Sequence, residues 1–295
     1  MSFSNSFHQF SKESAYDLSV VLPGINPGLW LQIYNDIKKS VGKYTFELIA
    51  IGPSYPSQEF LDLENTIYIQ DFGHPSRCVQ RGTTLATGKY ITHGVEARWA
   101  PAAGYENCIK LFEAELKLND GICVRFFEKD MDPSAPPPPQ PPQWPNVWSA
   151  WYHRDLQLPA VPRNAYCAPI WMYHLTFFRE IGGLDCRFEH INMNCHDLAF
   201  RVQANGGKIV PSPDIVINAD NEPASSPSQR PIEAAFHEND NPLFREIYSD
   251  PEAPIKRFKI DYNNWENTSE VWERRFGKIE LSEIAAKYSE NNNDN

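Results

Sequence analysis

The sequence predicts an α/β protein in which a mostly parallel sheet is covered by helices on both faces. Residues 18–22 (LSVVL) form an apolar run rich in β-branched side chains, which is typical of a strand buried on both faces of a parallel sheet. After the breaker PGINPG, residues 30–41 carry apolar side chains at helical spacing. Strand-like and helix-like segments go on alternating along the chain, which indicates right-handed βαβ units.

The later elements continue this alternation. Apolar or β-branched runs predict further strands at residues 46–51, 66–69, 90–92, 121–127 and 165–172. Helical spacing predicts helices at residues 76–86, 102–118, 175–181 and 198–204. In such sheets, ligands bind beyond the carboxyl ends of the strands. A site is therefore expected in the segments that follow the first four strands: residues 23–28, 52–55, 71–77 and 93–99.

Length and composition are those of an ordinary globular protein. The 295 residues are 41% hydrophobic and 22% charged, which leaves ample material for a buried core. The net charge of -11 argues against nonspecific binding to nucleic acid or to an anionic lipid surface. Six scattered cysteines without a Cys-x-x-Cys pair suit a reducing compartment. Since no targeting segment and no apolar stretch of membrane-spanning length is evident, we expect a soluble cytoplasmic protein.

We expect a single domain from residue 17 to about residue 280, preceded by a flexible segment of residues 1–16. The domain is expected to carry a helical extension at about 241–288, and residues 289–295 to form a polar, disordered tail. Proline dominates residues 132–145, where neither a helix nor a central strand can form, so we expect a solvated polyproline insertion. The functional alternative for this insertion is a lid over one side of a binding site or a strip that docks a partner.

Several short segments occur in an order that is informative as a set. They are LSVVLP from residue 18, FELIAI from residue 46, PSRCVQRG from residue 75, LATGKYI from residue 85, GGLD from residue 182 and HDLAFR from residue 196. Across residues 17–218 this series resembles the family 2 nucleotide-sugar glycosyltransferases. The resemblance implies a GT-A fold, which is a Rossmann-like α/β domain. It also implies transfer of a sugar from a nucleotide donor to a hydroxyl acceptor, with inversion.

The resemblance places the catalytic and acceptor-binding residues in the last two segments. An inverting enzyme needs a carboxylate base for the acceptor hydroxyl, and Asp197 holds the corresponding position. From the residues alone, Asp197 lies at the N-terminal end of the expected helix 198–204, where an aspartate is also a good N-cap. If Asp197 is only a cap, Asp185 and Glu189 are the next candidates for the base. The acceptor side is expected to contain Gly182, Gly183, Asp185, His196 and Trp151.

The donor side departs from the family pattern where the base and the metal bind. Gly52-Pro53 replaces an acidic pair. Val95-Glu96-Ala97 replaces an Asp-x-Asp motif, which leaves Glu96 as the one carboxylate of this motif for Mn²⁺ or Mg²⁺. We therefore expect weak metal dependence, with cationic side chains such as Arg81 helping to stabilise the leaving diphosphate. The residues expected to bind the donor are Pro23, Gly52, Arg77, Gln80, Glu96, Arg98 and His237.

Two other functions stay open at this point. A catalytically silent relative that binds a sugar or a protein partner is favoured by the missing acidic positions. A nucleotidyltransferase on a similar sheet is less favoured, because no glycine-rich phosphate loop followed by lysine occurs in the sequence.

Overall fold

The computed structural model describes residues 14–96, 98–99, 103–128, 147–148, 151–152, 166–219 and 230–268. The proline-rich insertion at 132–145 and the tail at 289–295 lie outside the described residues, as do nearly all of the N-terminal segment and the helical extension beyond residue 268. The expectations for these segments, and the domain bounds, therefore stay predictions. Within the described residues, no helix is both long enough and apolar enough to cross a membrane.

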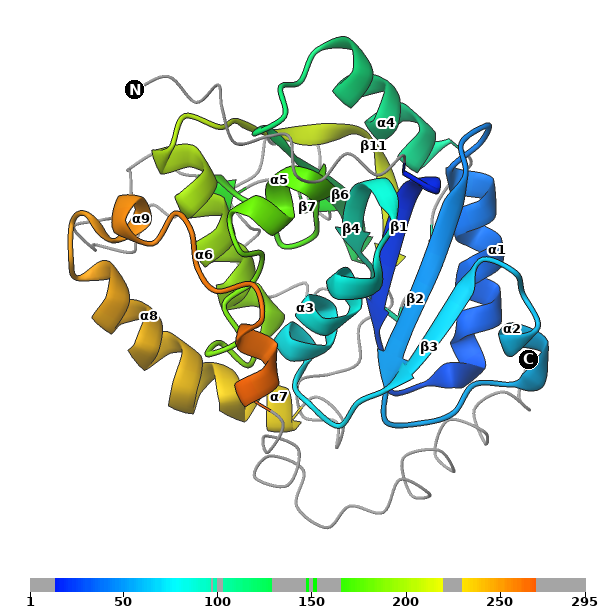
Figure 1. Cartoon of the computed structure of the whole chain (residues 1–295), viewed down its shortest axis with the longest axis horizontal. Helices are drawn as coiled ribbons and strands as arrows, with labels where there is room; N and C mark the ends of the chain where they lie inside the picture. Colours follow the sequence, from blue (N-terminus) through cyan, green and yellow to red (C-terminus); the bar gives the residue numbers. More distant parts are fainter. Residues whose placement is uncertain are drawn as a thin grey trace.

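Nine strands of the described chain form one sheet in the order β3-β2-β1-β4-β10-β6-β11-β5, with β7 beside β6. Figure 1 labels β1 to β4, β6, β7 and β11 of this sheet. Their bounds are β1 (Tyr16–Pro23), β2 (Phe46–Gly52), β3 (Thr66–Gln70), β4 (Gly88–His93), β5 (Arg98–Trp99), β6 (Gly121–Glu128), β7 (Val147–Trp148), β10 (Trp171–His174) and β11 (Ile209–Ala219). Two short strands, β8 (Trp151–Tyr152) and β9 (Tyr166–Cys167), form a separate pair.

Six of the nine strands run in one direction, namely β1 to β4, β6 and β11, while β5, β7 and β10 run the opposite way. This confirms the mostly parallel sheet expected from the sequence. The register brings Pro23 of β1 opposite Ile51 of β2, and Gly52 opposite Gln70 of β3. Val21 lies opposite His93 at the end of β4. The carboxyl ends of the first four strands therefore meet at one edge of the sheet.

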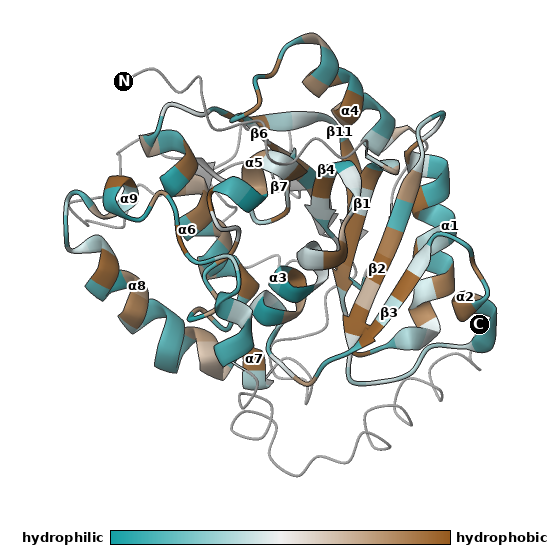
Figure 2. Cartoon of the chain, in the orientation of Figure 1, coloured by the Kyte–Doolittle hydropathy of each residue, from teal (hydrophilic) through white to brown (hydrophobic). Residues whose placement is uncertain are grey.

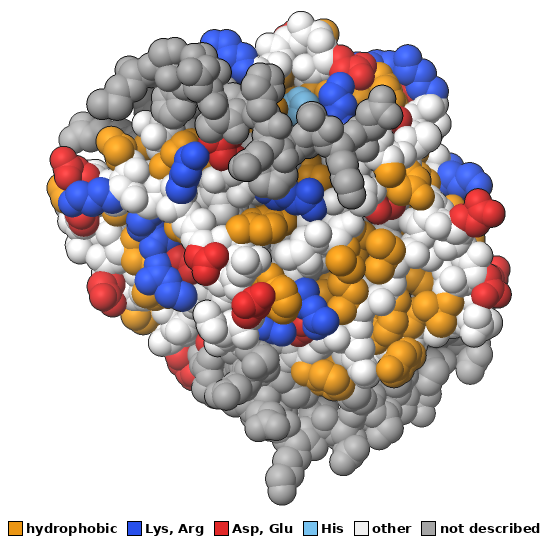
Figure 3. Space-filling model, in the orientation of Figure 1, with side chains coloured by type: hydrophobic (Ala, Val, Ile, Leu, Met, Phe, Trp, Pro, Cys, Tyr) orange, Lys and Arg blue, Asp and Glu red, His pale blue; other side chains and the backbone are white. Residues whose placement is uncertain are grey.

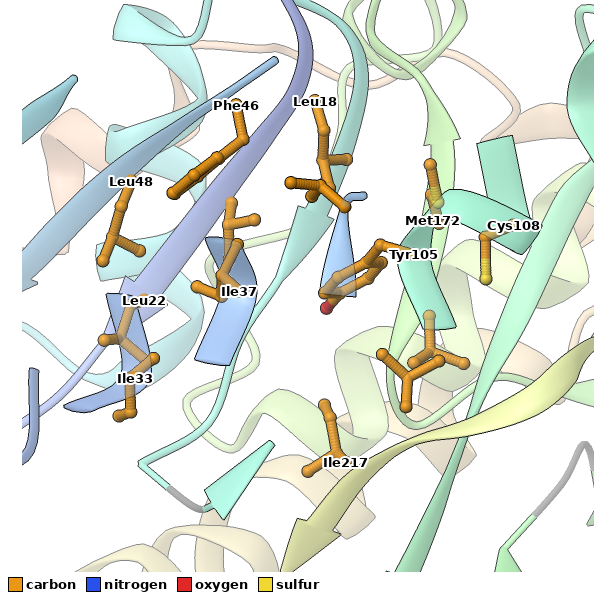
Figure 4. Packing of buried hydrophobic residues seen from close by; sticks show 14 of the residues in the cluster. Leu18, Leu22, Ile33, Ile37, Phe46, Leu48, Tyr105, Cys108, Met172 and Ile217 are labelled. Carbon is orange, nitrogen blue, oxygen red and sulfur yellow. The ribbon is translucent and has the colours of Figure 1, made fainter. Parts of the chain in front are cut away.

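Helices cover both faces of the sheet, as predicted. They are α1 (Trp30–Ser40), α2 (Gln58–Leu61), α3 (Pro75–Leu85), α4 (Gly104–Ala114), α5 (Leu175–Glu180) and α6 (Ile191–Ala204). Alternate residues of β1 enter two cores: Val20 and Leu22 pack with α1 and α4, while Val21 packs with α3, α5 and α6. Figure 4 shows the first core, with Ile33 and Tyr105 reaching the strands from the two helices. In Figure 2 the strands are mostly hydrophobic, and the helices also show hydrophilic residues.

The C-terminal part of the described chain is helical and packs on α6. It contains α7 (Arg230–Ala235), the π-helical turn η3 (Phe236–Asp240), α8 (Asn241–Tyr248), α9 (Ala253–Lys256) and the 3₁₀ turn η4 (Asn264–Asn267). Phe244 and Tyr248 of α8 form a third small core with Phe200 of α6. Residues 257–268, which we call the strap, then lie along α5 and α6 and reach α3 (Figure 1).

Three expected elements have different bounds in the structure. The strand expected at 165–172 is replaced by β9 and by β10, and the helix expected at 102–118 is limited to α4. The helix expected at 198–204 begins at Ile191, after the N-cap His190, whose Nδ1 accepts a hydrogen bond from the backbone N–H of Asn192. Every residue of α6 from Met193 to Val202 is buried, so its sequence carries no amphipathic stripe that would mark the first two turns.

Candidate functional site

The loops after β1 and β2 touch each other at the carboxyl edge of the sheet. The backbone N–H of Gly24 donates to the carbonyl of Ile51 at 3.0 Å. A Cβ atom on Gly52 would lie 1.8 Å from the carbonyl oxygen of Gly24, so only glycine permits this approach. Pro23 and Gly52, two of the expected donor-binding residues, therefore lie where the sheet offers a ligand site. Their binding role stays a prediction.

The loops after β2 and β3 add aromatic surface to the same edge. Tyr55 is 68% exposed and Phe72 is 38% exposed, although large hydrophobic side chains are mostly buried in this protein. The ring centroid of Tyr55 lies 5.3 Å from that of Tyr68. The hydroxyl of Tyr55 donates a hydrogen bond to Gln70 Oε1 at 3.2 Å. Figure 3 shows hydrophobic side chains gathered over the part of the surface that carries β3.

Glu96 supports the loop after β1. Its Oε1 accepts hydrogen bonds from the backbone N–H of Asn26 and from Trp30 Nε1, both at 2.7 Å, and its Oε2 accepts from the N–H of Ile25 at 2.9 Å. These bonds hold η2 (Pro27–Leu29) and the start of α1. Both oxygens of the carboxylate thus already bind three N–H groups. In addition, no group of three His, Cys, Asp or Glu side chains suited to a metal occurs in the described residues. Glu96 therefore holds the loop after β1, and its role as a metal ligand stays a prediction.

Replacing Glu96 with alanine should lower the stability of the protein whether or not a metal is present. The change leaves two backbone N–H groups of the loop and the indole N–H of Trp30 without their acceptor, which costs about 1–3 kcal/mol. Thermal or urea unfolding of Glu96→Ala with Mn²⁺ and with EDTA measures the effect. A metal ligand would behave differently: the variant would match the parent in EDTA and lose only a stabilisation by Mn²⁺. That result would show that Glu96 is a ligand of the metal ion.

Two arginines of α3 share one buried carboxylate at this edge. Arg77 Nε lies 3.0 Å from Asp71 Oδ1, and Arg81 Nη1 lies 2.6 Å from Asp71 Oδ2. Burial by itself would raise the pKa of Asp71, but hydrogen bonds from the two arginines outweigh it and lower the pKa. The N-cap of α3, His74, is kept neutral by burial, which lowers its pKa to about 4. The cluster of Asp71, Arg77 and Arg81 therefore carries a net charge of about one positive unit.

The Gly-Gly turn approaches other parts of the chain rather than open space. Gly182 and Gly183 have φ angles of 89° and 63°, which favour glycine. A Cβ on Gly182 would lie 2.1 Å from the carbonyl oxygen of Ile260, and one on Gly183 would lie 2.4 Å from Gln80 Oε1. The amide of the fully buried Gln80 donates to the carbonyl of Gly182 and accepts from the N–H of Leu184. Gln80 thus orients this turn, and its binding of the donor stays a prediction.

The expectation that Asp197 lies at a helix N-terminus is wrong. It lies in the second turn of α6 and is 0% exposed. Its Oδ2 is 2.8 Å from Arg201 Nε, and its Oδ1 is 3.0 Å from Arg257 Nη2. The hydroxyl of Tyr248 also donates to Oδ1 at 2.9 Å. Neither an N-cap nor a solvent-facing carboxylate describes this residue, because α6 starts earlier and α8 and the strap cover it.

Arg257 joins Asp197 to the acceptor-side loop. Its Nη2 lies 2.6 Å from Asp185 Oδ2, and Arg187 binds the same carboxylate at 2.7 Å. Burial would raise the pKa of Asp185, but hydrogen bonds from Arg187 and Arg257 lower it to about 2. His196 is 3% exposed and packs in the α6–α8 core, with its ring stacked 6.4 Å from Phe200. The expected contact between His196 and an acceptor stays a prediction.

The remaining expected residues fall into two groups. His237 lies on η3 and is exposed. The neighbouring Asp240 accepts hydrogen bonds from the N–H groups of Glu189 and His190, which places η3 beside the acceptor-side loop. The backbone of Arg98 pairs with β11 and that of Trp151 with β9, but their side chains lie outside the described residues.

The strap contributes residues that sequence reasoning missed. Asn264 Nδ2 donates to the carbonyl of Leu184 at 2.9 Å, and its Oδ1 accepts from the N–H of Cys186 at 2.8 Å. The indole of Trp265 lies over Arg77 and Arg81. A tryptophan within the polar stretch DYNNWEN was the one local signal, since such a ring needs a partner to be covered.

Comparisons with known proteins extend these observations. No protein-family model and no curated protein matches the sequence. Among solved structures, GalNAc-T7 with UDP, GalNAc and Mn²⁺ matches at 11% identity and a TM-score of 0.50, over 90% of this chain and 59% of that chain. This match, together with the mostly parallel sheet and the helices on both of its faces in this chain, decides the fold.

The chain has the GT-A fold. Two further matches are TarS residues 1–349 from S. aureus with UDP, and the mannosyltransferase PcManGT from Pyrobaculum calidifontis with GDP-Man and Mn²⁺. Both are 11% identical with a TM-score of 0.47; they cover 90% and 93% of this chain, and 76% and 80% of their own chains. This chain spans 40% of the length of a longer S. aureus TarS chain.

Proposed function

We propose that the chain is a glycosyltransferase that takes a sugar, a hexose or a pentose, from a nucleotide-sugar donor and binds the donor diphosphate with arginines instead of a metal ion. A hydroxyl group, such as that of a glycan, is the acceptor, and the reaction inverts the anomeric carbon as in family 2. One observation supports this proposal above the others. The positively charged cluster of Asp71, Arg77 and Arg81 lies at the ligand edge of a GT-A sheet.

The chemistry of the leaving group explains why such a cluster is needed. When the bond between the sugar and the diphosphate breaks, negative charge develops on the diphosphate. Guanidinium groups bind phosphate oxygens in a bidentate manner and stay charged at every physiological pH. Because Asp71 neutralises only one of the two arginines, the cluster can stabilise that charge where Glu96 holds no metal.

The base is proposed on the loop that faces α3. Asp185 and Asp197 are each bound by two arginines, so neither is suited to contact an acceptor hydroxyl. Glu189 lies instead beside the start of α3: its backbone carbonyl accepts a hydrogen bond from Ser76 Oγ at 3.4 Å, and its carboxylate acts on His74 electrostatically. We therefore assign the base to Glu189 in this proposal.

A silent donor-binding protein is the second candidate, and one observation favours it. All three carboxylates of the acceptor side are buried: Asp185 is 4%, Glu189 is 3% and Asp197 is 0% exposed. A protein that binds a nucleotide sugar without transferring it needs no accessible base. Donor binding with no release of UDP or GDP in the presence of any acceptor would favour this candidate.

Donor binding in EDTA tests the proposal. A set of UDP- and GDP-sugars is added to the full chain, and melting temperature and calorimetry report binding, since a ligand of the native state raises stability. At least one donor should bind in EDTA, with an affinity within about twofold of that in Mn²⁺. Arg81→Ala should weaken it by roughly tenfold or more, because a charge-assisted hydrogen bond contributes about 1.5–3 kcal/mol.

The matched control is Lys110→Ala, which removes the same charge from an exposed i,i+4 ion pair on α4. It should leave donor affinity unchanged. Failure of every donor to bind, or equal loss of affinity in the two variants, would contradict the arginine site.

A further inference from the structure

Trp265 of the strap covers the two cations on which the proposed function rests. Its ring centroid lies 5.2 Å from Arg77 Cζ and 5.5 Å from Arg81 Cζ. The carbonyl of Trp265 also accepts a hydrogen bond from Arg77 Nη1. Arg77 is consequently 8% exposed at its side chain, although it lies in the first turn of α3 at the ligand edge. A residue 188 positions along the chain thus occupies the face of the arginine pair.

This cover is weaker than the contacts around it. The side chain of Arg81 stays 32% exposed, and its hydrogen bonds in the described residues use one nitrogen, Nη1. The indole Nε1 of Trp265 is buried and finds no hydrogen-bond partner in the described part of the chain. A cation–π contact at a partly exposed site is modest in strength. Two phosphate groups, which accept several charge-assisted hydrogen bonds, can compete with it.

The rest of the strap is fastened before Trp265. The backbone carbonyl of Tyr262 accepts a hydrogen bond from Gln80 Nε2 at 2.8 Å. The hydroxyl of Tyr262 forms a 2.7 Å hydrogen bond with Thr83 Oγ1. Asn264 is bound to the acceptor-side loop on both sides of Asp185. These anchors hold the segment that leads to Trp265, so the indole can leave the arginines while the strap stays on α3. The strap therefore connects the acceptor-side loop to the diphosphate-binding cluster.

We propose that Trp265 is an autoinhibitory gate over Arg77 and Arg81, and that a diphosphate group displaces its indole to reach both guanidinium groups. The inference rests on the proposed donor site and adds a closed state to it. In the closed state the indole shields the cluster. In the open state the diphosphate replaces the indole. Asn264, which is next to Trp265 and hydrogen-bonded to Leu184 and Cys186, connects this displacement to the loop that carries Asp185 and Glu189.

Removing the gate should tighten the binding of diphosphate. Inorganic pyrophosphate is titrated into the parent, Trp265→Ala and Tyr262→Phe by calorimetry. Trp265→Ala should bind it roughly two- to tenfold more tightly than the parent, which is the range expected when the modest cation–π contacts of the indole with the two arginines no longer compete. Tyr262→Phe loses a strap anchor without uncovering the arginines and should bind like the parent. Arg81→Ala added to Trp265→Ala should remove the gain.

A direct view of the indole keeps the test valid if Trp265→Ala folds poorly. The parent is labelled with 5-fluorotryptophan, and the fluorine resonance of Trp265 is assigned as the one missing in Trp265→Phe, among the eight tryptophans of the chain. Saturating pyrophosphate should move that resonance to the position of a solvent-exposed indole. Bound pyrophosphate with an unmoved resonance would overturn the gate, and so would an absence of binding to both the parent and Trp265→Ala.

UDP and GDP separate this inference from the proposed function. If pyrophosphate displaces Trp265 and neither nucleotide binds, the gate stands and the nucleotide-sugar donor falls. If UDP or GDP binds with an unmoved Trp265 resonance, the donor site stands and the gate falls. If pyrophosphate and one of the two nucleotides bind and each moves the Trp265 resonance, the donor site and the gate are both supported.

Discussion

Asp197→Asn should lower the free energy of unfolding by about 3–5 kcal/mol, because it removes one partner of a buried ion pair and leaves the other uncompensated. Asp197 and Arg201 both have side chains that are 0% exposed, so water cannot replace the lost carboxylate. Arg257 keeps Asp185 as a partner, but Arg201 has only backbone carbonyls besides Asp197 in the described residues. Urea unfolding of parent and variant measures the change.

The same variant separates two roles for Asp197. A buried structural role predicts a large loss of stability, whereas a catalytic base predicts parental stability with transfer lost. Arg187→Ala is the control, since its side chain is 54% exposed in its pair with Asp185 and should contribute less than about 1 kcal/mol. Parental stability with lost turnover in Asp197→Asn would return the base to this residue.

Gly52→Ala should destabilise the protein by about 1–3 kcal/mol and weaken donor binding together. The added Cβ would lie 1.8 Å from the carbonyl oxygen of Gly24, which is backbone and cannot rotate away, so the loop after β1 must shift. If the donor loses a single contact worth about 1.4 kcal/mol through that shift, its affinity falls tenfold. Unfolding in urea and calorimetry with the bound nucleotide sugar measure the two effects.

Gly104→Ala provides the matched control for this prediction. Its new Cβ would have its nearest neighbour, Ser40 Oγ, at 3.2 Å, which needs only a small adjustment. It should therefore keep parental donor affinity and near-parental stability. A Gly52→Ala variant that unfolds and binds like the parent would show that the loop after β1 moves freely, and that Gly52 does not shape the site.

The fold could be predicted from the sequence because its signals are local. Residues 18–22 and 46–51 are apolar except for Ser19 and Glu47, and a strand buried on both faces requires a nearly continuous apolar run wherever it lies in a sheet. The breakers after these strands, and the glycine at residue 88, mark where the chain turns. The start of α6 could not be predicted, because this local signal is missing there. Its buried first turns carry Asn194, His196 and Asp197, and these polar side chains interrupt the apolar spacing that marks a helix.

The sequence by itself thus determined the strand and helix series, the doubly covered sheet and the edge where a ligand is expected to bind. Only the tertiary structure decided what the charged residues do there. Asp197 is bound by Arg257, 60 residues away, and Arg77 is covered by Trp265, 188 residues away. The sequence does not show whether a carboxylate faces water or a buried guanidinium, because burial and pairing depend on segments that meet only when the chain has folded.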